Sequence, residues 1–174
     1  DAESRMSIVD VYCPTENEIK PILPELTAHK VDDFINMIKH QGDLYKNGVE
    51  FSNTLMLYGV PGCGKSTVAK YIAQQIGLPL VIARLDALVS SLLGSTSKNI
   101  RKVFDFADSR PCILFLDEFD AIAKARDDQH ELGELKRVIN SLLQNIDSLS
   151  SNSILIAATN HADLLDKAIW RRFH

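Results

Sequence analysis

Residues 59–66 of the chain are Gly59-Val60-Pro61-Gly62-Cys63-Gly64-Lys65-Ser66, and Thr67 follows them. This stretch fits the pattern G-x-x-x-x-G-K-S/T and lies between an apolar run at 54–58 and an amphipathic run at 65–76. Gly62 and Gly64 permit the unusual backbone dihedrals that turn successive N–H groups toward a phosphate, and the first turn of a helix adds partial positive charge. The stretch therefore predicts a phosphate-binding loop that joins a strand to a helix.

The polar side chains of this loop have separate expected roles. Lys65 would supply a mobile cation for the β- and γ-phosphates of a nucleotide, and the hydroxyl of Ser66 would ligate Mg²⁺. Thr67 can donate a hydrogen bond to the α-phosphate. The alternative is a glycine-rich turn that only connects two elements, in which Cys63 is a small filler. The lysine, the hydroxyl and the flanking elements together favour nucleotide binding by residues 59–67.

The same alternation of apolar and amphipathic segments continues along the chain. Apolar runs at 54–58, 80–83, 112–117 and 153–158 predict strands that are covered on both faces, and amphipathic runs at 65–76, 97–108 and 132–147 predict helices between them. Such alternation predicts a parallel α/β sheet in one main domain, residues 49–174. Residues 1–48 are expected to form an N-terminal segment whose helix carries Val31, Phe34, Ile35 and Ile38 on one stripe.

Two acids end the third of these strands. Asp117 is placed to hold Mg²⁺ through its water shell, and Glu118 is placed to orient and polarise an attacking water. The alternative is a strand that ends in a solvated acidic turn. Asn160 follows the last strand, from which its amide can reach the γ-phosphate or the attacking water, although a Thr-Asn pair after a strand is more often only a turn.

Composition narrows the classes of protein to consider. The chain has 174 residues, 45% of them hydrophobic, and a formal net charge of -4, which disfavours binding to a nucleic-acid backbone. No apolar run is long enough to span a bilayer and no signal-peptide pattern begins the chain, so no membrane partner and a cytoplasmic location are expected. The three cysteines lack zinc spacing and are expected to be reduced thiols.

From about residue 31 to residue 174, the chain resembles the AAA family of ATPases. Residues 117–126 look like the extended acidic-strand motif of the valosin-containing-protein segregases, in which the arginine that corresponds to Arg126 lies at a subunit interface. Residues 158–160 resemble the sensor strand of the family. Residues 165–173 have the spacing of the katanin and spastin group, in which two adjacent arginines, here Arg171 and Arg172, reach the γ-phosphate bound by the next subunit.

This resemblance implies a doubly wound parallel P-loop NTPase sheet ordered 5-1-4-3-2, with the fifth strand and the small helical lid missing from this chain. It also implies Mg²⁺-dependent ATP hydrolysis by a homohexamer that remodels or unfolds a protein substrate. Lys65, Glu118 and Asn160 would act in their own subunit, and Arg171 and Arg172 would act on the next one. A solvated helix end is the alternative for the two arginines. No guanine-reading Asn-Lys-x-Asp motif is present, which agrees with ATP.

The chain departs from the family at the central-pore loop and at the adenine pocket. Leu92, in the segment 91–94, stands where protein-threading members usually carry an aromatic residue. The short Asp-containing segment that lines the adenine pocket is not recognisable. A nucleotide-dependent switch or scaffold that threads no substrate is therefore the alternative function, and a nucleic-acid motor is a third, which the acidic balance disfavours.

Overall fold

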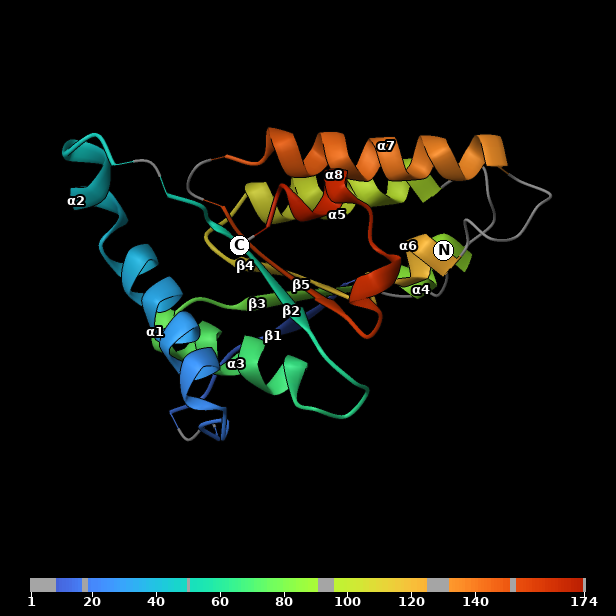
Figure 1. Ribbon diagram of the computed structural model, residues 1–174. Coiled ribbons are helices and arrows are strands. Elements are labelled where there is room, and N and C mark those ends of the chain that lie inside the picture. Colours follow the sequence, from blue (N-terminus) through green and yellow to red (C-terminus); the bar gives the residue numbers. More distant parts are fainter. Residues whose placement is uncertain are drawn as a thin grey trace.

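The computed structural model describes residues 9–16, 19–49, 51–90, 96–124, 132–150 and 153–173 (Figure 1). The strands are β1 (Val9–Tyr12), β2 (Thr54–Tyr58), β3 (Leu80–Arg84), β4 (Ile113–Asp117) and β5 (Ile154–Thr159). The helices are α1 (Glu25–Lys39), α2 (Gln41–Lys46), α3 (Lys65–Ile76), α4 (Leu85–Ser90), α5 (Thr96–Asp108), α6 (Ala121–Lys124), α7 (Leu132–Ser148), the 3₁₀ turn η1 (Ala162–Leu164) and α8 (Lys167–Trp170).

Four of the strands run parallel in the order that the family resemblance implies. The strand before the phosphate-binding loop, β2, pairs with β5, which pairs with β4, which in turn pairs with β3. These pairings are the 1-4-3-2 part of the expected order, so the predicted doubly wound α/β fold is confirmed. Each predicted strand, and each of the predicted helices α3, α5 and α7, begins and ends within one residue of its predicted position.

The sheet is buried on both faces because successive residues of a strand point to opposite sides. In β4, Leu114 and Leu116 belong to the apolar cluster that also contains α5 and α7 residues. Ile113 and Phe115 belong to the cluster that also contains α1 and α3 residues. This arrangement explains why the strand sequences are continuous apolar runs instead of alternating ones.

Helices cover the two faces of the sheet. Figure 1 shows α5 and α7 together above the sheet and α1 and α3 below it, in agreement with the contacts that α5 makes with α7 and α1 makes with α3. The predicted stripe of α1, which consists of Val31, Phe34, Ile35 and Ile38, is buried. The layers therefore hold the loops at the carboxyl ends of the strands on a rigid base.

Strand β1 was not predicted. It pairs antiparallel with β3 through the register Val9↔Ala83 to Tyr12↔Leu80, so the N-terminal segment contributes a strand to the sheet edge. The sequence Val9-Asp10-Val11-Tyr12 has only four residues and is too short to produce a clear strand pattern. The pairing covers backbone groups of β3 that would otherwise form an open edge.

The short elements α2, α4, α6, η1 and α8 were also not predicted, because segments of three to six residues carry no measurable periodicity. Two predicted features, Leu92 of the pore-loop segment and the interface arginine Arg126, lie outside the described residues. Within the described part of the chain, none of the helices combines the length and the apolar character that crossing a bilayer requires.

Candidate active site

The carboxyl ends of the parallel strands meet at one edge of the sheet, and the predicted site residues lie at that edge. Asp117 is the last residue of β4, and Asn160 directly follows β5. Gly59 directly follows β2, and its N–H donates to the carbonyl oxygen of Thr159 at 3.3 Å. The topology thus brings groups from three separate parts of the sequence to neighbouring strand ends, where open parallel sheets bind their ligands.

The loop between β2 and α3 has the backbone that its glycines predict. Gly62 and Gly64 have φ values of 77° and 93°, in the left-handed region where a side chain would cause strain. A Cβ on Gly59 would lie 2.9 Å from the Sγ of Cys63. Helix α3 begins at Lys65, so its first N–H groups and its positive dipole end face the loop. This geometry suits a bound phosphate.

The side chain of Lys65 folds over the same loop. Its Nζ donates to the carbonyl oxygens of Gly59 at 2.9 Å and Val60 at 3.1 Å, and it lies 3.7 Å from the Sγ of Cys63. An ammonium group is a compact charge with three donors on a flexible stem. It can therefore exchange these carbonyl partners for phosphate oxygens with a small movement.

Ser66 and Asp117, the two predicted metal ligands, lie together. The Oγ of Ser66 donates to the Oδ2 of Asp117 at 3.5 Å, although 51 positions separate the two residues in the sequence. Across the described residues, no group of three or more His, Cys, Asp or Glu side chains is arranged to hold a metal. A hydroxyl and one carboxylate suit Mg²⁺, because this ion keeps several waters and takes its other oxygens from the phosphates of its substrate.

Glu118 adopts an unusual backbone conformation. Its φ is 55°, the one positive value among the described non-glycine residues. Its N–H donates to the Oδ1 of Asp117 at 2.8 Å, and the next N–H, that of Phe119, donates to the carbonyl oxygen of Ala158 on β5 at 2.8 Å. Such strain persists where surrounding contacts enforce it, and it often marks functional sites. Here it occurs directly after Asp117, the last residue of β4.

The carboxylate of Glu118 lies beside a charged pair from the end of β3. An Arg84 guanidinium nitrogen is 3.0 Å from the Oδ2 of Asp86 and 4.0 Å from the Oε2 of Glu118. Burial is the main cause that raises the pKa of Glu118 above its ordinary value, followed by a hydrogen bond with Asp86 and the negative charge of that residue, while Arg84 opposes the rise. Glu118 thus lies in the kind of environment that makes a carboxylate more basic.

Asp120 joins the two strands that carry the predicted catalytic groups. Its side chain is buried, with the residue 2% exposed. Its Oδ1 accepts a hydrogen bond from the Oγ1 of Thr159 at 3.2 Å and another from the backbone N–H of Asn160 at 3.0 Å. The position of Asn160 is therefore tied to the segment that follows Glu118.

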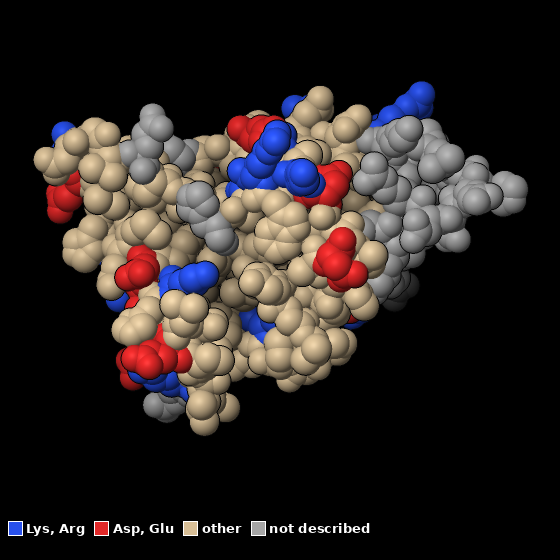
Figure 2. Space-filling model, viewed as in Figure 1, with Lys and Arg blue, Asp and Glu red and all other residues tan. Residues whose placement is uncertain are grey.

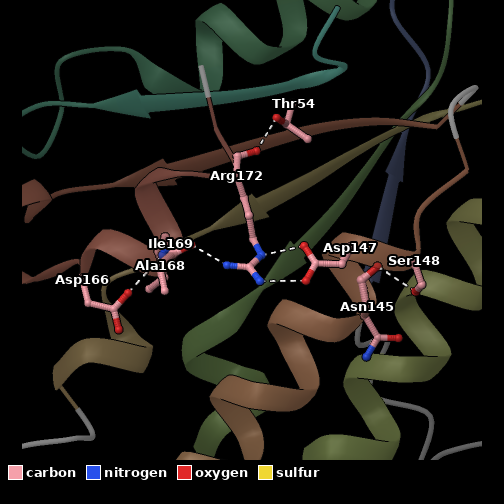
Figure 3. Close-up of polar contacts among 8 residues, drawn as sticks. All are labelled: Thr54, Asn145, Asp147, Ser148, Asp166, Ala168, Ile169 and Arg172. Carbon is pink, nitrogen blue, oxygen red and sulfur yellow. Dashed lines mark hydrogen bonds and ion pairs between the residues drawn. The ribbon is translucent and has the colours of Figure 1, made fainter. Parts of the chain in front are cut away.

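Arg171 and Arg172, the predicted trans-acting pair, have different surroundings. Figure 2 shows Lys and Arg side chains gathered over α8 with acidic side chains beside them. Arg171 is exposed, and its side chain has no polar partner among the residues that the structure describes. Arg172 instead forms an ion pair with Asp147 of α7, as Figure 3 shows, with Nε 2.6 Å from Oδ1.

Aromatic contacts fix the segment that carries these arginines. Trp170 packs edge-on against Tyr58 of β2 with ring centroids 5.7 Å apart. Phe173 packs in the same way against Phe119, also at 5.7 Å. Because Phe119 follows Glu118, the segment that carries the two arginines packs directly against the segment that carries Glu118.

Four residues of this region were not found from the sequence. Arg84, Asp86 and Asp147 are ordinary charged residues near the ends of a strand or helix, and a single sequence contains no signal that separates them from solvated charges. Asp120 could have been suspected, because an acid among Phe119, Ala121 and Ile122 interrupts an apolar stretch and a buried acid requires partners.

Comparisons with known proteins agree with this geometry. A sequence profile described as "ATPase family associated with various cellular activities (AAA)" matches residues 55–174. The chain is 42% identical over 171 residues to "Uncharacterized AAA family ATPase y4kL" of Sinorhizobium fredii, covering 98% of this chain and 52% of that protein. It is 32% identical over 154 residues to "Peroxisomal ATPase PEX6" of Komagataella pastoris, covering 84% of this chain and 13% of that protein. For the protein of the same name from Arabidopsis thaliana, the identity is 37% over 134 residues, or 74% of this chain and 14% of that protein.

The chain spans about half the length of the y4kL protein and a much smaller part of each PEX6 protein. The region that matches the family profile contains the phosphate-binding loop, the two acids at the end of β4 and the adjacent arginines. A profile match over most of the chain, together with the parallel strand order, leads to one conclusion. The chain belongs to the AAA family of ATPases.

Proposed function

We propose that this chain binds Mg-ATP at the carboxyl edge of its sheet and hydrolyses it. Residues 59–67 hold the phosphates, with Lys65 at the β- and γ-phosphates. Ser66 and Asp117 hold Mg²⁺, which supplies charge neutralisation at the transferring phosphoryl group. Glu118 accepts the proton of the attacking water, and Asn160 positions that water.

The observation that carries this proposal is the meeting of these groups at adjacent strand ends. The Ser66 and Asp117 oxygens are 3.5 Å apart, and Lys65 Nζ lies on the loop that directly precedes Ser66. The two acids also have separate environments: Asp117 contacts Ser66, while Glu118 has a positive φ and lies beside Arg84. Separate surroundings allow one acid to hold a metal and the other to act as a base.

We further propose that the active form is a ring, a homohexamer, in which Arg171 reaches the γ-phosphate bound by the neighbouring subunit. Arg171 supports this proposal because it is exposed on a segment that aromatic contacts hold in place. A guanidinium is always charged and matches phosphate oxygens in geometry. The energy of hydrolysis would then drive the remodelling of a protein partner in the cytoplasm.

A direct test uses the full-length protein. Wild type should hydrolyse ATP only with Mg²⁺, and Glu118→Gln should bind ATP with wild-type affinity while its kcat falls by about 10²–10⁴-fold, because general-base catalysis is worth that much. Hydrolysis at the wild-type rate by Glu118→Gln would move the role of base to another residue. If wild type binds ATP and changes its assembly state but hydrolyses none, the chain is a nucleotide-dependent switch instead of a motor.

A further inference from the structure

We propose that Asp120 is a positioning residue that holds the segment carrying Asn160 at a fixed place relative to the segment carrying Glu118. This inference rests on the proposed function, in which Asn160 positions the water that Glu118 activates. It extends that function by assigning to a buried acid the task of aligning two catalytic groups that come from two different strands.

The side chain of Asp120 bonds directly to the residues at the end of β5. Its Oδ1 accepts hydrogen bonds from the Oγ1 of Thr159 at 3.2 Å and from the backbone N–H of Asn160 at 3.0 Å. A carboxylate is costly to bury even when it is hydrogen-bonded, and a well-packed apolar side chain is often at least as stable in its place. The position that these bonds define therefore explains the acid better than stability alone.

The hydroxyl of Thr159 extends this hold to the residue after Asn160. The same Oγ1 that donates to Asp120 accepts a hydrogen bond from the N–H of His161 at 3.1 Å. The peptide N–H groups on both sides of the Asn160 Cα are thus bound by one small network. The backbone from which the Asn160 side chain projects is fixed before a substrate binds, as a catalytic group requires.

The end of β5 is also bonded to the two other parts of the site. The N–H of Phe119, which directly follows Glu118, donates to the carbonyl oxygen of Ala158 at 2.8 Å. From β2, on the opposite side of β5, the N–H of Gly59 donates to the carbonyl oxygen of Thr159 at 3.3 Å. The last residues of β5 therefore connect the phosphate-binding loop to the segment after β4. Alignment of this kind matters because a displacement of about 1 Å can lower a rate by about 10²-fold.

A positioning role and a purely stabilising role predict different kinetics. If Asp120 positions Asn160, changes at Asp120 or Thr159 lower kcat through Asn160, so they have no further effect once the Asn160 amide is removed. If Asp120 only stabilises the fold, the same changes lower the free energy of unfolding and leave kcat of the folded protein unchanged.

The experiment measures steady-state ATP hydrolysis by the full-length protein and its Asp120→Ala and Thr159→Val variants. We expect kcat to fall by about 10- to 100-fold in Asp120→Ala and by about 3- to 10-fold in Thr159→Val, which keeps the shape of the side chain but removes the hydroxyl. KM for ATP should stay within about twofold, because the phosphate-binding loop is unchanged. Asp120→Asn and Thr159→Ser keep the acceptor and the hydroxyl, so they should retain most of kcat.

A double-mutant cycle tests whether the effect passes through Asn160. Asn160→Ala should lower kcat by about 10²-fold, as the loss of one polar contact to the transition state does. Adding Thr159→Val to Asn160→Ala should lower kcat by less than about twofold more, since the amide that Thr159 helps to place is already absent. Independent effects would instead multiply.

Asp108 offers a control at the opposite end of the same strand. Its Oδ1 accepts hydrogen bonds from the Oγ of Ser153, directly before β5, at 2.6 Å and from the backbone N–H of Ser150 at 3.4 Å. Asp108→Ala thus removes the same kinds of bond, one from a hydroxyl and one from a backbone N–H, far from the carboxyl edge of the sheet. It should keep the wild-type kcat.

Two results would overturn the inference. Wild-type kcat in Thr159→Val and in Asp120→Ala, with both proteins folded by thermal unfolding, would limit Asp120 to a stabilising role. A Thr159→Val effect that is equally large with and without the Asn160 amide would show that the network acts by another route. Thr159→Val decides alone if Asp120→Ala does not fold. Wild-type kcat in Asn160→Ala is a distinct outcome, because it would overturn the proposed role of Asn160 itself.

Discussion

At the scale of single residues, Lys65 gives a direct prediction about nucleotide binding. Its Nζ now contacts two loop carbonyls, and we expect it to transfer to phosphate oxygens when a nucleotide binds. Hydrogen bonds to charged groups contribute about 1.5–3 kcal/mol each, so Lys65→Ala should weaken Mg-ATP binding by roughly 10- to 100-fold. Isothermal titration calorimetry measures this change. Lys70→Ala is the control on the same helix, since Lys70 lies over the ring of Tyr12 at 4.6 Å. Equal affinities in wild type and Lys65→Ala would contradict the assignment of the loop.

Asp120 gives a second prediction at this scale. Its buried Oδ1 accepts two hydrogen bonds, so Asp120→Ala leaves the Thr159 hydroxyl and the Asn160 N–H without that partner. An unsatisfied buried donor costs about 1–3 kcal/mol, and we expect a loss of that order in the free energy of unfolding, measured with urea. Asp120→Asn keeps an oxygen acceptor and should lose less. If Asp120→Ala and Asp120→Asn are equally stable, the two hydrogen bonds to Oδ1 contribute little to folding.

Single residues also show how far the sequence predicts the site. The phosphate-binding loop and the acids at 117 and 118 are recognisable because each belongs to a short motif with fixed spacing. Asp120 and Asp147 form hydrogen bonds with residues that lie 39 and 25 positions away in the sequence, and nothing local indicates those contacts. Such long-range contacts are therefore found from the fold, whereas the residues of a phosphate-binding motif can be recognised in the sequence.

At the scale of secondary structure, the contact between α7 and the α8 segment should depend on pH. The hydrogen bond from Arg172 lowers the pKa of Asp147 below its ordinary value near 3.8. A lowered folded pKa means that the pair contributes stability above the unfolded pKa, and that this contribution is lost as the pH falls through the folded pKa. Asp147→Asn should therefore have a lower Tm than wild type at pH 7. The difference should shrink below about pH 4, where wild type also loses the carboxylate.

The measurement is thermal unfolding of both proteins between pH 7 and pH 3. Because Asp147 is half exposed, the effect on Tm should be small. Asp105→Asn is the control, because Asp105 forms an exposed ion pair with Arg101 on the same helix. A difference between wild type and Asp147→Asn that stays constant across the whole range would show that the carboxylate charge is not its cause.

Secondary structure was predicted well where segments are long and periodic. The helix α3 and the strand β2 were found with their observed bounds because a phosphate-binding motif lies between them and apolar residues fill both. Strand β1 was missed because its stability comes from pairing with β3, a contact across about seventy residues of sequence. Helix α8 was missed for the same reason: its buried Ile169 and the packing of Trp170 on Tyr58 hold it, while its own length does not.

At the scale of the whole molecule, the proposed catalytic groups lie in two different places on the chain. The phosphate-binding loop, the acids and Asn160 lie at the carboxyl edge of the sheet. The arginine segment packs against β2 and Phe119 and turns Arg171 outward. An arginine that faces outward can contact another molecule, as the proposed trans-acting role of Arg171 requires. Contacts of this head-to-tail kind close into a ring when the rotation between subunits is suitable.

This reasoning leads to a test with two variants that are each inactive for a different reason. Glu118→Gln lacks the base but keeps Arg171, and Arg171→Ala lacks the arginine but keeps the base. Loss of such an arginine is worth ~10³–10⁵ in kcat, so each protein alone should be nearly silent. If Arg171 acts on the next subunit, mixing them at equal amounts creates sites in which an Arg171→Ala subunit receives the arginine of a Glu118→Gln neighbour. With random mixing, the chance of that arrangement is one half times one half, or about a quarter of all sites in a closed ring.

ATP hydrolysis should therefore appear on mixing, and it should disappear on dilution to concentrations at which the wild-type rate per subunit also falls. A mixture that stays silent, although both variants assemble, would place the arginine and the base in the same subunit, and the site would then be complete within a single chain.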